Sequence, residues 1–208
     1  MIVSKSAVSE NSTPLAGTFG QVAPLAPESS AEAAVRRHLE TLGIDHQIVP
    51  CDPALADTAA FCDAYGYALE DSANTIIVVG KGDSGRFVAC VVLATTRLDV
   101  NRVVRKRLGV KKASFADPEQ TRQLTGMLIG GVTPLALPDD LPIWVDERVI
   151  QRPQIILGGG SRSCKVIGPP TQLLAPPRVE VIRDLAVPAP GALPAAGADA
   201  DRRPREPS

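Results

Sequence analysis

The chain has 208 residues, a formal net charge of −1, 44% hydrophobic residues and only 3% aromatic residues. This length suits one domain with terminal tails better than two full domains, and the core must be built mostly from Val, Leu, Ile and Ala. A net charge this close to zero excludes a whole-chain attraction to nucleic acid, so any such contact needs a local basic patch.

The cysteines and histidines do not indicate a metal site. The sequence has four cysteines and two histidines, and no two cysteines stand in a C-x-x-C spacing. We therefore expect neither a metal nor a cofactor. Residues 1–28 lack the basic start and apolar run of a signal peptide, and no apolar run reaches membrane-spanning length. A cytoplasmic protein with reduced cysteines is the expectation.

Composition divides the chain into three parts. Residues 1–28 are rich in Ser, Pro, Gly and Ala without clear periodicity, and we interpret them as a flexible lead-in. Residues 184–208 alternate Pro, Ala and Gly and end in a charged segment. Such a composition cannot bury enough apolar area to offset the entropy lost on ordering, so we predict a disordered tail. The folded domain is expected at residues 29–183.

Helix signals recur at four places in this domain. Ser29 and Glu32 form a capping-box pattern, and Gly43 supplies a stop. Asp117 followed by Pro118 is a well-formed helix start, because the aspartate can cap and proline suits the first helical position. We predict helices at residues 29–42, 57–69, 100–108 and 118–125, with a short one at 169–174.

Strand signals are more numerous than helix signals. The β-branched run at residues 75–79 predicts a buried strand, and a glycine-containing turn at 81–85 connects it to a returning strand at 87–93. Further strands are predicted at residues 44–49, 112–115, 143–145, 155–157, 165–167 and 179–182. The fold class is therefore α+β, with a mixed, largely antiparallel sheet flanked by helices and no strict β-α-β alternation.

The stretch from Gly126 to Pro134 contains three glycines and a proline in nine residues. Such a composition excludes a helix, and a proline does not fit a central strand. The Gly130-Gly131 pair can adopt positive φ and bring backbone N–H groups close to a ligand. A tight turn between two elements is the simpler alternative.

An ordered series of motifs in the chain resembles the YbaK/ProX family, the freestanding relatives of the editing domain of bacterial prolyl-tRNA synthetases. The likeness covers roughly residues 29–176. The motifs, in chain order, are Leu98-Asp99, Leu108-Gly109-Val110, Ala116-Asp117-Pro118-Glu119, Leu124-Thr125-Gly126, Gly130-Gly131-Val132-Thr133-Pro134, Val145-Asp146-Glu147 and Gly158-Gly159-Gly160-Ser161.

This resemblance implies an aminoacyl-tRNA deacylase that edits in trans. Such enzymes hydrolyse the ester that joins a small wrong amino acid, commonly alanine or cysteine, to proline tRNA. They act as a second sieve, because a synthetase pocket rejects a smaller side chain by only a few kcal/mol. The implied partner is the acceptor end of a mischarged tRNA, with a tRNA synthetase as a further candidate. Neither DNA nor a membrane is expected.

The resemblance also implies the site. Family members hold the substrate with backbone amides of the glycine loop and place a lysine before a buried strand, where this chain has Asn74. Asparagine carries no charge, so it cannot give a charge-assisted hydrogen bond. We assign Asn74 and Gly131 to catalysis. The residues expected to bind substrate are Thr75, Gly130, Thr133, Pro134, Asp146, Gly158, Gly159, Gly160 and Lys165.

Several of these residues have a simpler interpretation. Lys165 can replace the family's lysine or can be a solvated residue at a strand start. Turn and strand threonines commonly bond their own backbone, and Asp146 can begin the next turn. A basic run at residues 97–112 is predicted to contact RNA phosphates or to be a solvated helix face. Its candidate RNA-binding residues are Arg97, Arg102, Arg105 and Lys106.

Two functions remain open on the sequence alone. The first is the deacylase, with activity reduced or altered because Asn74 replaces the family's lysine. The second is a non-catalytic module that keeps the fold and binds tRNA, a nucleotide or a protein. A general small-ester hydrolase has no support, because the sequence contains no nucleophile motif.

Overall fold

The β-branched run after Ser72 forms β2 (Ala73–Lys81), a central strand of the largest sheet. The computed structural model describes residues 29–81, 85–174 and 178–190. The predicted lead-in at 1–28 and the segment 191–208 lie outside these residues. So does most of the predicted turn at 81–85.

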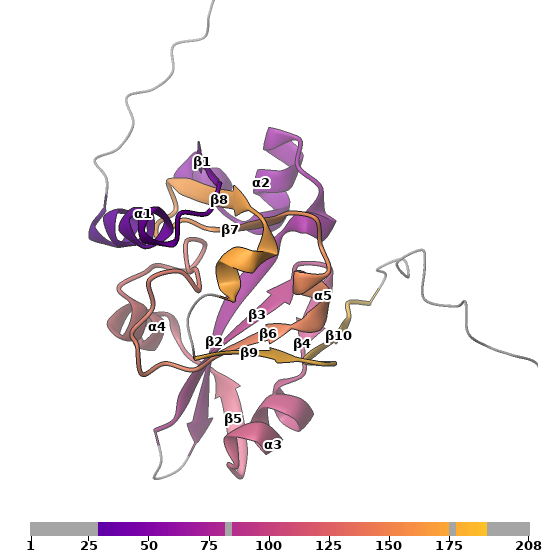
Figure 1. Ribbon diagram of the computed structural model, residues 1–208. Helices are drawn as coiled ribbons and strands as arrows, with labels where there is room; N and C mark the ends of the chain where they lie inside the picture. The colour runs from indigo at the N-terminus through magenta and orange to yellow at the C-terminus, as the bar shows by residue number, and fades with distance from the viewer. Residues whose placement is uncertain (1–28, 82–84, 175–177, 191–208) are drawn as a thin grey trace, which may run out of the picture.

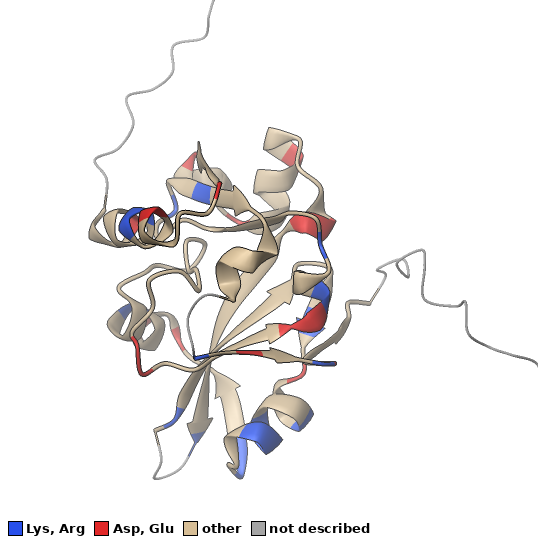
Figure 2. Ribbon diagram, in the orientation of Figure 1, with Lys and Arg blue, Asp and Glu red and all other residues tan. Residues whose placement is uncertain are grey.

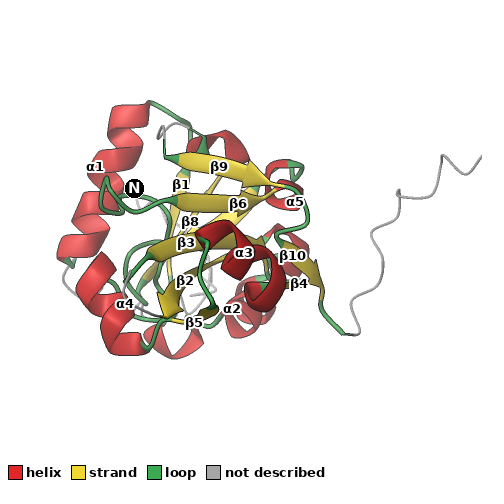
Figure 3. Ribbon diagram, turned by 90° about the horizontal axis from the view of Figure 1, so that it is seen from below, coloured by secondary structure: helices red, strands yellow, loops and turns green. Residues whose placement is uncertain are grey.

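The largest sheet has five strands in the order β5-β2-β3-β6-β9 (Figure 3). Its other members are β5 (Lys112–Phe115), β3 (Phe87–Leu93), β6 (Ile143–Asp146) and β9 (Val179–Ile182). β2 pairs antiparallel with both β3 and β5, whereas β3, β6 and β9 run parallel to one another. The predicted mixed sheet of an α+β fold is therefore confirmed.

A second, three-stranded sheet covers one end of the first (Figure 1). It is antiparallel and has the order β1 (Gln47–Pro50), β8 (Cys164–Gly168) and β7 (Ile155–Gly158). The two sheets meet where Ser72, directly before β2, bridges to Ile156 of β7. This junction places the start of β2 beside β7 and β8.

The helices begin and end largely where their caps predict. In α1 (Ser30–Leu42), the Ser29 side chain accepts from the Glu32 N–H, and Gly43 ends the helix at φ 60°. α4 (Pro118–Thr125) has the complete Asp117 capping box. α2 (Thr58–Tyr65) is shorter than predicted, because Gly66 adopts φ 73° and stops it.

The remaining helical segments are short. The predicted helix at 100–108 is a π-helical turn at Val100–Val104 followed by α3 (Arg105–Leu108). α5 (Glu147–Ile150) follows β6 and was not predicted. Single 3₁₀ turns occur at Pro53–Leu55, Leu69–Asp71 and Pro170–Leu173.

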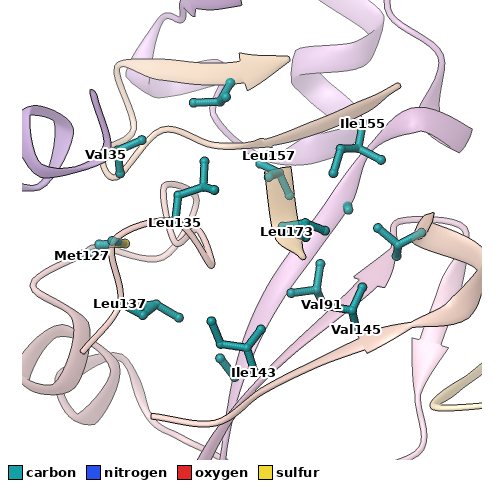
Figure 4. Close-up of a cluster of buried hydrophobic side chains, with 14 of the residues drawn as sticks. Val35, Val91, Met127, Leu135, Leu137, Ile143, Val145, Ile155, Leu157 and Leu173 are labelled. Carbon is teal, nitrogen blue, oxygen red and sulfur yellow. The ribbon is translucent and has the colours of Figure 1, made fainter. Parts of the chain in front are cut away.

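Apolar side chains fill both faces of the five-stranded sheet. On one face, a cluster joins β3 and β6 to α1, β7 and the segment after α4 (Figure 4). On the other face, Val78, Cys90 and Trp144 pack against Val104 and Leu185. Burial on both faces is the reason why β2 and β3 have continuous apolar sequences rather than alternating ones.

The domain extends beyond residue 183, where we predicted its end. β10 (Ala186–Pro188) pairs antiparallel with β4 (Thr96–Leu98), and Leu185 before it is fully buried. Both strands have three residues, and β10 ends in a proline, so neither gives a strand signal in the sequence. Within the described residues, no helix is both long enough and apolar enough to cross a membrane.

Candidate functional site

A cavity of about 430 Å³ opens where the two sheets meet. Its walls come from the first half of β2, from α2, from the glycine loop after α4, and from β7 and β8. Five of the predicted site residues line it: Asn74, Thr75, Gly130, Gly158 and Lys165. The structure therefore brings the two glycine segments and position 74 together, as the family resemblance implies.

The two glycine segments, residues 130–131 and 158–160, pack closely against each other. The Gly160 N–H donates to the Gly131 carbonyl oxygen over 2.9 Å. A Cβ on Gly131 would lie 2.2 Å from the carbonyl carbon of Ser161, and one on Gly158 would lie 2.6 Å from the Gly131 oxygen. No residue larger than glycine fits at either position without moving the backbone.

This close packing corrects the role predicted for the Gly131 amide. Its N–H donates to the Leu128 carbonyl oxygen over 2.9 Å, and Gly131 does not line the cavity. The Gly159 N–H likewise donates to the Cys164 carbonyl over 3.2 Å. These glycines therefore shape the wall, and their backbone bonds stay within the protein. Gly130, at φ 94°, is the member of the loop pair that faces the cavity.

One wall of the cavity is polar but uncharged. Asn74 is half-buried, and its Oδ1 accepts a hydrogen bond of 2.7 Å from the Thr58 hydroxyl. The Thr75 hydroxyl is buried and has no partner among the described residues. Because a buried polar group normally has a partner, this hydroxyl is available to a bound molecule.

The part of the lining that β8 supplies carries a buried ammonium. Lys165 lies in the middle strand of the three-stranded sheet, and its residue is only 5% exposed. Its Nζ donates to the carbonyl oxygens of Ala56, over 2.6 Å, and Gly130, over 2.9 Å. It also lies 5.6 Å from the centre of the Phe61 ring. Burial lowers the pKa of Lys165 below its usual value. The alternative interpretation of Lys165 as a solvated residue at a strand start is therefore wrong.

Four predicted substrate-binding residues do not line the cavity: Thr133, Pro134, Gly159 and Gly160. Thr133 is fully buried, and its hydroxyl lies 3.5 Å from the Leu135 N–H in the loop's own turn. Gly160, at φ 94°, packs against the backbone of Ala31 in α1. These residues support the loops that form the wall.

Asp146 also lies outside the cavity. It is fully buried at the start of α5, where it accepts from the Arg148 N–H at 3.0 Å and the Ala186 N–H at 2.9 Å. Its carboxylate also pairs with the Arg148 guanidinium at 3.1 Å. All of these bonds join parts of the protein, so the substrate-binding role predicted for Asp146 is not supported.

Residues of α2 and of the cavity rim also line the cavity, although they were not predicted as site residues. Thr58 and Phe61 enter the site from α2, and Phe115 and Ile129 line its mouth while remaining 57% and 53% exposed. No spacing motif marks these residues, because only the tertiary packing brings them together. Phe115 and Ile129 stand out because their large apolar side chains are exposed, but exposure can be seen only in the structure.

The predicted RNA-binding residues are exposed but stand apart from the cavity. None of Arg97, Arg102, Arg105 and Lys106 lines it. Figure 2 shows blue segments, which mark Lys and Arg, on α3 and the neighbouring end of β5. Lys112 of β5 pairs with Lys81, seven residues along β2 from Asn74. At about 3.3 Å per residue, the separation is about 23 Å.

Metal-ligating side chains do not converge in this region. Among the described residues, no group of three or more His, Cys, Asp or Glu side chains is placed to hold a metal ion. The cysteines at 51, 62, 90 and 164 are all free and buried. Burial raises the pKa of Cys164 to about 11, so its thiol is poorly ionised near neutral pH.

Comparisons with known proteins agree with this architecture. The chain is 24% identical over 140 residues to the uncharacterized protein YwhH of Bacillus subtilis (strain 168), covering 67% of this chain and 87% of the relative. A solved structure of a candidate trans-editing enzyme for prolyl tRNA synthetase matches with a TM-score of 0.64 and 26% identity, over 75% of this chain and 97% of the other.

A second solved structure, the hypothetical protein APE2540, has a TM-score of 0.66 and 23% identity over 74% of this chain and 99% of that one. At this identity it supports the fold alone. The model of the aminoacyl-tRNA editing domain matches residues 52–175. Together with the trans-editing neighbour, it supports a function of the tRNA-deacylase type. Because that match spans more than half of the sequence, the chain belongs to the aminoacyl-tRNA editing domain family, of which YbaK-like proteins are members.

Proposed function

We propose that this protein hydrolyses mischarged aminoacyl-tRNA in trans, with proline tRNA that carries alanine or cysteine as the substrate. The observation that carries the proposal is the cavity lined by both glycine segments, because its lining also includes the Lys165 ammonium and Thr75, whose hydroxyl has no partner among the described residues. Two polar groups in the lining of one cavity suit a small ester better than an apolar ligand.

The reaction requires no protein nucleophile. A water molecule adds its oxygen to the ester carbonyl carbon, the bond from that carbon to the ribose oxygen breaks, and the ribose oxygen takes the proton of the water. The neighbouring ribose hydroxyl can assist, which leaves positioning and charge stabilisation to the protein. This fits a cavity lined by asparagine, threonine and lysine rather than by a catalytic serine or cysteine.

The rim of the cavity offers a path for the 3′ end of the tRNA. Single-stranded nucleotides are recognised by stacking on aromatic side chains, and Phe115 is an exposed aromatic residue at the mouth. Phe115 and Lys112 are the two ends of β5. With the terminal adenosine at the cavity, the preceding nucleotides would follow β5 toward the basic side chains of α3, which suit phosphates.

The test is a deacylation panel on proline tRNA charged with alanine, cysteine or proline. We expect wild-type protein to release alanine or cysteine faster than buffer does and to leave the proline ester intact. Gly131→Ala should abolish the activity, because its Cβ would overlap the Ser161 backbone. Gly43→Ala is the control, because that glycine, at φ 60°, also disfavours alanine but has no atom within 4 Å of an added Cβ.

One observation favours a second candidate, a tRNA-binding module without catalysis. Position 74 is neutral, and its side-chain oxygen is already bonded to Thr58. In this case wild-type protein would bind the mischarged tRNA without accelerating its hydrolysis, and Asn74→Lys would introduce activity. The deacylase proposal fails if wild-type rates equal buffer rates on all three tRNAs while the binding isotherm is saturable.

A further inference from the structure

Lys165 is a buried charge inside the cavity that has no counter-ion. Its Nζ contacts two carbonyl oxygens, and within residues 29–81, 85–174 and 178–190 it forms no ion pair. Buried lysines are rare unless they are paired, because removing an ammonium from water costs several kcal/mol. A charge that stays buried without a partner carboxylate therefore indicates a site for an anionic or strongly polarised ligand.

The donor geometry of Lys165 leaves one N–H available. An ammonium has three N–H donors, and the carbonyls of Ala56 and Gly130 take two of them. The Phe61 ring supports the positive charge from another side, at 5.6 Å. No described residue accepts the third N–H, and Lys165 is part of the cavity lining.

The charges around Lys165 do not neutralise it. The carboxylate of Asp57, which also lines the cavity, pairs with Arg162 at 3.4 Å and is largely exposed. Arg162 itself brings a second positive charge near the ammonium. The two cations, Lys165 and Arg162, therefore outnumber the one carboxylate beside them, although the net charge of the whole chain is −1.

We propose that Lys165 is the catalytic cation of this site. Its third N–H binds the carbonyl oxygen of the aminoacyl ester and stabilises the negative charge that develops there when water adds to the carbonyl carbon. The inference rests on the proposed deacylase function and deepens it. It places the charge on β8 of the three-stranded sheet rather than on β2, so the neutral residue at position 74 does not leave the cavity without a cation.

The alternative is that Lys165 only ties two loops together, and the chain contains a matched control for it. Arg162 donates to the carbonyls of Pro53, over 2.9 Å, and Ile129, over 3.0 Å. These positions lie beside Ala56 and Gly130, so both side chains join the same two segments. Arg162 does not line the cavity. A purely structural role predicts similar defects when either cation is removed.

The experiment compares Lys165→Met with Arg162→Met in single-turnover and steady-state deacylation of alanyl proline tRNA, with thermal unfolding of both variants. We expect Lys165→Met to lower kcat by about 10²–10³-fold with little change in KM, as for the loss of one oxyanion donor. Arg162→Met should lose less than tenfold in kcat. Similar losses in both variants, or a Lys165→Met kcat close to that of wild type, would overturn the inference and leave the deacylase proposal standing.

A second measurement decides the matter even if Lys165→Met does not fold. Two stable analogues of 3′-alanyl adenosine are compared on the wild-type protein, one with an amide and one with an anionic phosphonate in place of the ester. Transition-state analogues bind at least about 10²-fold more tightly than ground-state analogues, so the phosphonate should show that preference. Equal affinities would overturn the role of Lys165, whereas a wild-type protein without deacylase activity would overturn both proposals.

Discussion

Lys165 and Asp146 are both charged, both buried and both placed in strands, yet their surroundings differ. Asp146 is fully buried, and its carboxylate accepts from two backbone N–H groups and an arginine. Lys165 is 5% exposed, and its hydrogen-bond partners among the described residues are two carbonyl oxygens. Asp146 is compensated within the protein, and Lys165 is not. Burial alone therefore does not distinguish a structural charge from a candidate functional one. The hydrogen-bond and ion-pair partners of the two side chains do distinguish them.

The largest effect expected from this comparison is a loss of folding stability when Asp146 is replaced. Asp146→Ala should lower the free energy of unfolding by about 3–5 kcal/mol, because it removes the acceptor of the Ala186 N–H and the buried one of the two carboxylates that pair with Arg148. Urea denaturation measures the loss. The kcat of the folded fraction should not change, because Asp146 lies outside the cavity.

Asp139→Ala is the control for that variant. Asp139 pairs with Arg178 at 2.8 Å, but its side chain is fully exposed, so its removal should leave the urea midpoint nearly unchanged. A fall in kcat for Asp146→Ala at temperatures where it is folded would contradict the comparison and return Asp146 to the substrate site.

A smaller effect is expected on the uncharged wall. Thr58→Val removes the donor to Asn74 Oδ1 and should cost about 1 kcal/mol of stability. Because Asn74 is half-buried, water in the cavity can replace the lost donor. The deacylation rate should therefore fall far less than in Lys165→Met. Thr58→Ser, which keeps the hydroxyl, serves as the control. A loss as large as that of Lys165→Met would show that the neutral wall supplies the chemistry.

The smallest effect is a dependence of stability on pH. Burial lowers the pKa of Lys165 below 10.5, so between these two pKa values the folded protein has released a proton that the unfolded chain still holds. The free energy of unfolding contributed by Lys165 therefore rises with pH through the lowered pKa and levels off above 10.5.

Urea denaturation from neutral pH to pH 11 checks this sign. The stability of the wild type minus that of Lys165→Met should increase with pH across that window. The other groups that face the ammonium, which are Cys51, Asp57, Cys62 and Arg162, are present in both proteins, so they largely cancel in the difference. A difference that decreases with pH would mean that Lys165 has a stabilising counter-ion after all.

Local signals predicted much of this fold. Gly43 and Gly109 end their helices in the left-handed conformation, and the Asp117 capping box forms in full. The β-branched run at 75–79 forms β2. In each case the signal and its effect lie within a few residues, so the sequence contains both. The predicted extension of this helix to residue 69 is wrong, because Gly66 adopts the left-handed conformation and ends α2.

The site was predictable only in part. Asn74, Gly130, Gly158 and Lys165 come together in one cavity, as the family resemblance implies. The sequence did not show that the Gly131 N–H is used within its own loop. It also gave no sign of Thr58 and Phe61, which reach the cavity from α2. Hydrogen-bond partners and cavity walls depend on long-range packing, which no spacing of residues encodes.

The pairing of β10 with β4 has a practical consequence for trimming the protein. A version that stops at residue 183, where composition alone would place the cut, lacks Leu185, which fills the second apolar cluster. It also deprives Arg148 of the Ala186 carbonyl and Asp146 of the Ala186 amide. Shortened versions meant for crystals or for binding assays should keep at least Pro188, the last residue of β10.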